Sequence, residues 1–230
     1  MNASLIIAIV GAESTGKTAL AEALAARVAS ETGLRCTWVP EHLRAWCQSA
    51  GRTPRPDEQA EIAASQRAAI EAAAGEHGVV LADTTPLMTA VYSRLLFADD
   101  SLTADAASWH RHCALTLLTA LDLPWVADGL QRDGPQVRAP VDADLRQLLT
   151  QHRLPWALVS GAGDERVGNA LDALAPLLRT MSAPKRGLFT RLEQRNAADK
   201  PWICSDCDDP DCEHRVFGAA GAGGARDATV

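Results

Sequence analysis

The stretch Gly11-Ala12-Glu13-Ser14-Thr15-Gly16-Lys17-Thr18 decides the fold of this chain. It matches in full the pattern G-x-x-x-x-G-K-[ST] of a phosphate-binding loop. The continuous apolar segment 5–10 before it predicts a buried strand, and the alanine-rich segment 19–30 after it predicts a helix. An ordinary glycine turn is the alternative. Because strand, turn and helix come in the order that the motif requires, the sequence predicts a nucleoside triphosphate site.

Each position of this loop has a physical task at a phosphate. Gly11 and Gly16 let the chain curl, so that successive backbone N–H groups surround phosphate oxygens at a helix N-terminus. Lys17 supplies a positive charge for the β- and γ-phosphates, and the Thr18 hydroxyl is a candidate ligand of Mg²⁺. All eight residues are therefore candidate ATP-binding residues, and the expected cofactors are ATP and Mg²⁺.

Length and composition limit the number of domains, the partners and the cellular location that can be expected. A chain of 230 residues can bury one substantial core and carry a small appendage. Its net charge of −7 argues against a nucleic-acid partner, because phosphate backbones attract basic surfaces. The first apolar run is too short to span a bilayer, and no basic leader or small-residue cleavage site precedes it. Six cysteines are then expected as free thiols or metal ligands. We expect a cytoplasmic protein.

Strands and helices alternate along the chain. The predicted strands are 5–10, 35–39, 79–83, 113–119 and 156–160, and the predicted helices are 19–30, 44–50, 57–75, 86–97, 142–152 and 165–179. Segment 113–119 could instead continue a long helix from residue 105, but a sheet of this class needs a strand there. We predict an α/β fold, a P-loop three-layer sandwich with a five-stranded, mainly parallel sheet, over residues 1–182.

Two carboxylates are expected at one edge of this sheet. Asp83 ends the third predicted strand, where doubly wound sheets place their ligands, and it is a candidate partner of Mg²⁺ or else a helix-capping residue. Glu41 follows the second strand and could accept the proton of an acceptor hydroxyl. Arg44 lies on the same helical face as Glu41, where it could bind phosphate, orient Glu41, or form a solvated pair with it.

A loop rich in glycine and proline, residues 121–140, is predicted to form a lid. It carries Trp125, Asp128, Arg132 and Arg138. In a kinase, a lid arginine can hold the γ-phosphoryl group as it moves, and closure excludes water that would hydrolyse ATP. Either arginine could be the catalytic one, or both could be surface charge.

The order of these motifs resembles a known family. Gly11–Thr18, Glu41-x-x-Arg44, Leu81-Ala82-Asp83-Thr84 and Leu123-Pro124-Trp125-Val126-Ala127-Asp128-Gly129-Leu130 are similar to the nicotinamide riboside kinase domain of bacterial NAD-biosynthesis regulators and to related AAA-type ATPases and kinases. The similarity covers residues 4–180. One departure is that Gln131 precedes Arg132, where the family pattern has arginine directly after Gly-Leu.

The resemblance implies phosphorylation of the ribose 5′-hydroxyl of nicotinamide riboside by ATP. It implies that Lys17 and Thr18 bind ATP-Mg, that Glu41 and Asp83 are site carboxylates, and that Asp128 belongs to the lid. Trp125 or Trp46 could stack on the nicotinamide ring or simply pack. Two alternatives remain: a P-loop ATPase that acts as a regulatory switch, and a kinase of another nucleoside or metabolite.

The composition changes after residue 182. Residues 183–217 form a cysteine-rich extension, and the glycine- and alanine-rich residues 218–230 are expected to be disordered. Cys204, Cys207, Cys212 and His214 are candidate ligands of a structural zinc, with Asp206, Asp211 or water as alternatives to His214. Otherwise these are free thiols. The extension could also hold a protein partner or a second copy of the chain.

The remaining cysteines and two histidines receive simpler interpretations. Cys36, Cys47 and Cys113 are isolated in the sequence, and we predict that they are core residues. His110 and His112 lie two positions apart near Trp109, and we predict a solvated face for them.

Overall fold

A computed structural model describes residues 4–126 and 134–181 of the chain. Within these residues, five strands form one sheet in the order β2-β3-β1-β4-β5, and every neighbouring pair is parallel. The apolar strand β1 is central because parallel sheets bury their middle strands on both faces. The strands are β1 Leu5–Val10, β2 Cys36–Val39, β3 Val79–Asp83, β4 Cys113–Thr119 and β5 Trp156–Val159.

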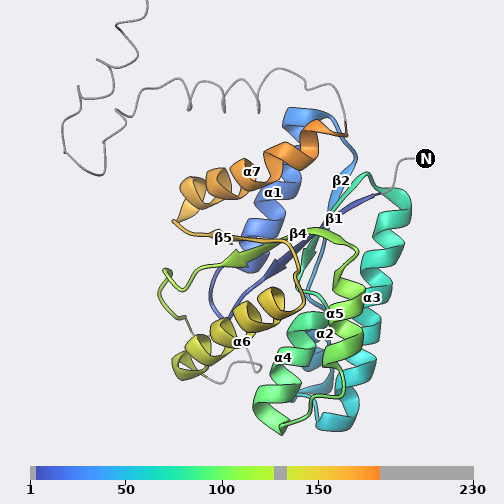
Figure 1. Cartoon of the computed structure of the whole chain (residues 1–230), viewed down its shortest axis with the longest axis vertical. Helices are drawn as coiled ribbons and strands as arrows, with labels where there is room; N and C mark the ends of the chain where they lie inside the picture. Colours follow the sequence, from blue (N-terminus) through green and yellow to red (C-terminus); the bar gives the residue numbers. More distant parts are fainter. Residues whose placement is uncertain (1–3, 127–133, 182–230) are drawn as a thin grey trace, which may run out of the picture. The chain divides into compact units, whose positions relative to one another are not determined.

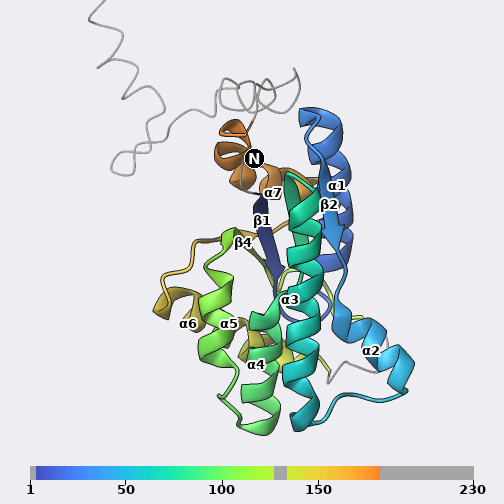
Figure 2. The same ribbon diagram turned by 90° about the vertical axis from the view of Figure 1, so that its right-hand side faces the viewer.

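Helices cover both faces of the sheet (Figure 1). One layer holds α1 and α7, which contact each other, and the other holds α3, α4, α5 and α6. Figure 2 shows α2 standing beside the lower half of α3, with which it is in contact. The helices are α1 Lys17–Thr32, α2 His42–Ala50, α3 Gln59–Glu76, α4 Pro86–Phe97, α5 Thr103–His110, α6 Arg138–Gln151 and α7 Gly163–Arg179.

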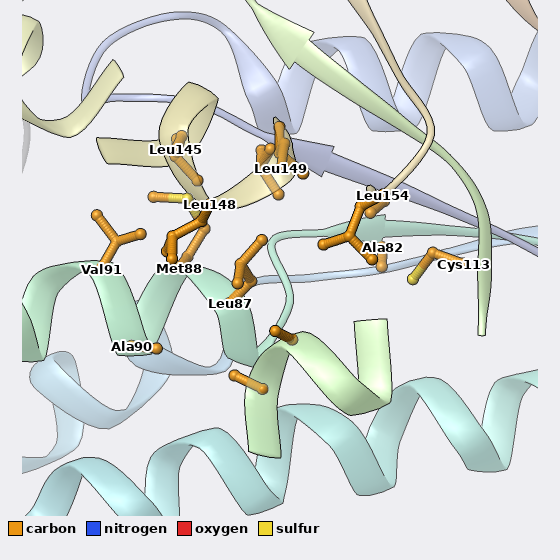
Figure 3. Packing of buried hydrophobic residues seen from close by; sticks show 14 of the residues in the cluster. Ala82, Leu87, Met88, Ala90, Val91, Cys113, Leu145, Leu148, Leu149 and Leu154 are labelled. Carbon is orange, nitrogen blue, oxygen red and sulfur yellow. The ribbon is translucent and has the colours of Figure 1, made fainter. Parts of the chain in front are cut away.

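The core follows the alternation of side chains along β1. Ile6, Ala8 and Val10 belong to a buried cluster with residues of α3, α4, α5 and α6. Ile7 and Ile9 are completely buried on the opposite face, toward α1 and α7. Figure 3 shows how the leucines of α6 lie against the apolar side chains of α4. This packing fixes both helix layers on the sheet, and with them the loops that follow each strand.

The predicted fold class is confirmed, and segment 113–119 is strand β4 rather than part of a long helix. Five of the six predicted helix starts were wrong: α1, α2 and α7 begin two residues earlier than predicted, at Lys17, His42 and Gly163, and two further helices begin after 3₁₀ turns. The helix placed at 57–75 is preceded by a short 3₁₀ turn, Pro56–Glu58, and α3 begins at Gln59. The helix placed at 142–152 begins at Arg138, after a second 3₁₀ turn, Pro135–Val137. Pro140 is tolerated in its first turn because N–H groups there have no helical partner.

The described residues belong to one compact unit. The predicted boundaries of the extension and the tail, together with the candidate zinc ligands, lie outside the described residues and stay predictions. Among the described residues, no group of three or more His, Cys, Asp or Glu side chains is placed to hold a metal ion. None of the described helices has the length and apolar character needed to cross a bilayer.

Candidate active site

The phosphate-binding loop joins β1 to α1, and its two glycines are required by the backbone. Gly11 has a φ of 152°, and a Cβ there would collide with the Thr119 hydroxyl on β4. Gly16 has a left-handed φ of 75° at the N-terminus of α1, a conformation that costs glycine little. The backbone therefore adopts the curled geometry that the motif predicts.

Hydroxyl groups hold the loop against the sheet. The Thr15 and Thr119 hydroxyl oxygens lie 2.7 Å apart, and Thr15 Oγ1 is 2.8 Å from the Ala12 carbonyl oxygen. Lys17 Nζ donates a hydrogen bond to the same carbonyl at 2.9 Å. The lysine side chain is thus folded back over its own loop.

Thr18 and Asp83 meet as predicted at the C-terminal edge of the sheet. The Thr18 hydroxyl donates to Asp83 Oδ2 at 2.5 Å. Asp83 is buried, and its Oδ1 has no hydrogen-bond partner among the described residues. Burial raises the pKa of Asp83, although the Thr18 hydrogen bond and the positive charges of Lys17 and Arg44 oppose this shift. A buried carboxylate oxygen without a donor is suited to a cation.

The backbone after Asp83 is strained. Thr84 has a φ of 69°, a left-handed conformation that β-branched residues rarely adopt. Its N–H donates to the Ile9 carbonyl at 3.0 Å, which continues the pairing of β3 with β1 by one residue. Such strain persists only where the surroundings enforce it, and it is concentrated at functional sites.

Glu41 precedes α2 and lies near Arg44, one turn further on. The Arg44 Nη2 and Glu41 Oε2 atoms are 3.6 Å apart. The buried amide of Gln66 on α3 holds the start of α2 in place, because its Oε1 accepts the His42 N–H at 2.7 Å. Gln66 Nε2 is 3.4 Å from the carbonyl oxygens of both Pro40 and Thr84. One side chain therefore links the loop that carries Glu41 to the loop that follows Asp83.

A cavity of about 320 Å³ opens beside the phosphate-binding loop. Lys17 lines it on the loop side, and Glu41 and Arg44 line it at the start of α2. Gln59 adds an amide from the first residue of α3. Much of the remaining wall is apolar and comes from α4: Met88, Tyr92, Leu96 and Phe97. The structure thus brings five predicted site residues together around a space large enough for a small molecule: Glu13, Ser14, Lys17, Glu41 and Arg44.

The predicted lid is described only at its two ends. The Val126 N–H donates to Ser14 Oγ at 2.8 Å, which docks the first part of the segment on the phosphate-binding loop. Trp125 Nε1 is buried and has no hydrogen-bond partner among the described residues. Arg138 begins α6 and donates from Nη2 to the Leu123 carbonyl at 2.9 Å. Asp128 and Arg132 lie outside the described residues.

The sequence interpretation missed Arg166, a buried residue in the first turns of α7. Its Nη1 donates to Asp122 Oδ1 at 2.8 Å, and its Nη2 donates to the carbonyls of Thr15 at 3.0 Å and Ala120 at 3.2 Å. Nη1 also reaches the Gly161 carbonyl at 2.5 Å. The guanidinium thus joins the phosphate-binding loop to the ends of β4 and β5. An arginine in an amphipathic helix is usually solvated, so no sequence signal marked this one.

The prediction of a solvated face for His110 was wrong. His110 is buried between Thr85 Oγ1 at 3.0 Å and Thr116 Oγ1 at 2.7 Å. Burial lowers the pKa of His110 to about 4, so the ring is neutral at physiological pH. Thr85 immediately precedes α4, and the histidine therefore anchors the start of that helix to β4.

Two of the three cysteines in the described part of the chain are core residues, as predicted. Cys47 and Cys113 are buried and Cys36 is partly buried, and none of them forms a disulfide. Burial raises the pKa of both the Cys36 and the Cys113 thiol to about 12. These thiols stay protonated at neutral pH, which excludes them as nucleophiles.

Fold and loop together define a P-loop protein with a kinase-like α/β architecture. Residues 6–166 match the model of a family described as AAA domain. Since this match spans more than half of the chain, the protein belongs to that AAA-domain family.

Solved structures with the same fold include two of NadR proteins. One, in complex with NR, has a TM-score of 0.60 and 19% identity, with 75% of this chain and 50% of that chain covered. The other, in complex with NAD and AMP-PNP, has a TM-score of 0.62 and 19% identity, with 80% and 51% covered. This chain therefore spans about half the length of these NadR chains.

A deoxyadenosine kinase from M. mycoides has a TM-score of 0.51 and 10% identity, with 75% of this chain and 100% of that chain covered. At such identities the likeness shows the fold alone. No curated protein sequence matches this chain.

Proposed function

We propose that this protein is an ATP-dependent kinase that transfers the γ-phosphoryl group to the ribose 5′-hydroxyl of nicotinamide riboside. The observation that carries the proposal is the cavity of about 320 Å³ that Lys17 and Glu41 line together. An ATPase that acts as a switch needs only water as the acceptor and has no use for such a space. The NadR likeness and the kinase fold support the choice of reaction and acceptor.

In this proposal the transfer is driven by positioning and by charge. Glu41 accepts the proton of the acceptor hydroxyl, and Arg44 orients the Glu41 carboxylate. Lys17 leaves the Ala12 carbonyl and neutralises the β- and γ-phosphates. Arg132 or Arg138 neutralises the moving phosphoryl group when the lid closes.

The residues present fit a magnesium ion. Asp83 supplies a buried carboxylate oxygen without a donor, and the Thr18 hydroxyl lies 2.5 Å from its other oxygen. These are hard oxygen groups of the kind that Mg²⁺ prefers. Such an ion would supply positive charge that offsets the negative charge of the phosphates. Asp83 and Thr18 would hold this ion and keep it at the sheet edge.

Trp125 and Asp128 complete the proposed substrate-binding set. Trp125 lies one residue before Val126, which is bound to Ser14 of the phosphate-binding loop. From there the indole could cover an aromatic acceptor when the lid closes. Trp46 is less suited to this task because the Arg52 guanidinium already lies over its ring, 5.1 Å from the centroid.

The test is a panel of nucleosides incubated with ATP and Mg²⁺, with products identified by mass spectrometry. We expect a monophosphate of nicotinamide riboside. Lys17→Ala should lower kcat/KM at least a hundredfold, because the positive charge that neutralises the transferred phosphoryl group is lost. Arg27→Ala, at a partly exposed position of the same helix, is the matched control and should change kcat/KM less than twofold.

Three outcomes separate the alternatives. Hydrolysis of ATP that no nucleoside accelerates, without any phosphorylated nucleoside, would reject the kinase and favour the switch. Phosphorylation of a different nucleoside alone would keep the kinase and replace the acceptor. A Lys17→Ala variant with full activity would overturn the role of the loop itself.

A further inference from the structure

Two glutamines lie on the same face of α3, and their environments differ. Gln59 and Gln66 are seven residues apart, which is two helical turns. Both are buried, with exposed fractions of 4% and 3%. A pair of buried amides on one helix face offers a direct comparison of how each satisfies its hydrogen-bonding groups.

The Gln66 amide is fully bonded within the protein. Its oxygen accepts the His42 N–H, and its nitrogen lies within hydrogen-bonding distance of the Pro40 and Thr84 carbonyls. Both halves of the amide therefore have partners on neighbouring loops. Gln66 is a structural residue, and the space around it contributes only a small pocket of about 10 Å³.

The Gln59 amide, in contrast to that of Gln66, has no hydrogen-bond partner among the described residues. It lines the large cavity. Its amide atoms are not among the fully buried polar atoms without a partner, so they border the cavity and are not sealed in the core. A buried amide that faces an open cavity is retained where a ligand supplies the missing partners.

We propose that Gln59 determines the specificity of the acceptor site by pairing with a carboxamide. A primary amide presents one acceptor and one donor side by side, so that a carboxamide on an aromatic ring can form two hydrogen bonds with it. The apolar side chains Met88, Tyr92 and Phe97 in the same cavity would exclude water from this pair. The inference rests on the proposed function and names the group by which that site recognises its substrate.

The same chemistry predicts which analogue is rejected. A carboxylate at the position of the carboxamide offers acceptors only, so the Gln59 carbonyl would face a lone pair and a negative charge. A site built to bond both halves of an amide discriminates against a group that lacks one of them. Nicotinic acid riboside is therefore the informative competitor of nicotinamide riboside, because the two differ only at this group.

The experiment compares kcat/KM for the two ribosides at saturating ATP-Mg in the full chain. The enzyme should favour nicotinamide riboside. Gln59→Leu should lower kcat/KM for nicotinamide riboside by roughly ten- to a hundredfold and change that for nicotinic acid riboside less than threefold. Thermal unfolding should show that Gln59→Leu is at least as stable as the parent, because the lost amide makes no hydrogen bond to the described residues and leucine places apolar surface at a position that is 4% exposed.

Gln66→Leu is the matched control on the same helix face. It should lower the unfolding temperature and reduce kcat for both ribosides alike, since it disturbs the loops rather than the acceptor. Equal losses for both ribosides in Gln59→Leu, or no loss, would overturn the inference. A parent enzyme that phosphorylates neither riboside but another nucleoside refutes the carboxamide contact and leaves the kinase intact. A parent enzyme without any phosphorylated product refutes the proposed function and the inference together.

Discussion

The two ends of the candidate active site are built in different ways. The phosphate end is formed by backbone at the carboxyl edge of the sheet, and its groups are bonded to one another through Thr15, Thr119 and Arg166. The acceptor end is formed by side chains from three helices, α2, α3 and α4. It keeps a cavity, an amide without a partner at Gln59, and an exposed Leu96 at the rim, with 47% of its surface accessible.

This difference in construction gives the two ends different tasks: the phosphate end binds the triphosphate, and the acceptor end selects the acceptor. A backbone cradle binds any triphosphate, because phosphate offers the same oxygens whatever nucleoside carries it. An acceptor must instead be selected, and side chains can change without altering the fold. Apart from Asp83 Oδ1, which is left for a cation, the phosphate end is therefore held together by bonds within the protein, whereas the acceptor end is completed by its ligand. Substitutions at the two ends should therefore have different effects on stability and on activity.

The largest expected effect comes from Arg166, which holds the phosphate end together. Arg166→Leu removes the donor to Asp122 Oδ1 and to the carbonyl oxygens of Thr15 and Ala120, while the Gly161 N–H still donates to Asp122 Oδ2. Removing one partner of a buried ion pair costs about 3–5 kcal/mol. Because Asp122 is partly exposed, we expect a loss of about 3 kcal/mol in the free energy of unfolding, measured by urea titration.

The control for this prediction is Arg67→Leu, which removes an exposed ion pair with Glu71 on α3. Such pairs contribute less than about 0.5 kcal/mol. The KM for ATP should rise in Arg166→Leu and stay unchanged in the control. Equal stability of the two variants would show that the phosphate end is held by its backbone alone.

A smaller effect is expected from His110, which anchors α4 behind the acceptor end. Its pKa is about 4 in the folded protein and near 6.5 in the unfolded chain. The unfolded state therefore binds a proton first as the pH falls, and stability that is present above pH 6.5 is lost toward pH 4. Between pH 7.5 and 5 we expect a loss of about 2 kcal/mol from this residue.

The measurement is urea unfolding of the parent and of His110→Gln at both pH values. Glutamine keeps a donor and an acceptor for Thr85 and Thr116 but does not titrate. The parent should therefore lose more stability than the variant on acidification. If both lose the same amount, the folded histidine takes up its proton as readily as the unfolded one, and burial does not lower its pKa.

The sequence predicted the phosphate end well because its signals are local. The motif, the strand before it and the helix after it are contiguous, and Asp83 ends a strand that is apolar throughout. Parallel strands then place Thr18 and Asp83 at one edge without further information. The errors near this end were boundaries, such as the start of α6 at Arg138, where a proline in the first helical turn looked like loop.

The acceptor end could not be predicted to the same extent. Gln59 and Tyr92 come from different helices, and nothing in their local sequence shows that they face one cavity. Arg166 and His110 were missed for a related reason, because a charged or polar residue on a helix is exposed unless tertiary contacts bury it. Glu41 was predicted because it follows a strand, which is again a local signal.

The smallest expected effect on stability lies at Asp83, which is bonded to Thr18 in the phosphate end. Asp83→Asn keeps an oxygen for the Thr18 hydroxyl and removes a buried charge. We expect the free energy of unfolding at pH 7 to rise by on the order of 1 kcal/mol, while kcat/KM falls at least a hundredfold. Because the pKa of Asp83 is raised, its folded carboxyl binds a proton more tightly than the unfolded one. The parent therefore regains this stability as the pH falls through the folded pKa, and the advantage of the variant disappears there. An Asp83→Asn variant that is less stable at pH 7 would show that the carboxylate is stabilised by partners within the protein, and that the phosphate end is complete without a cation.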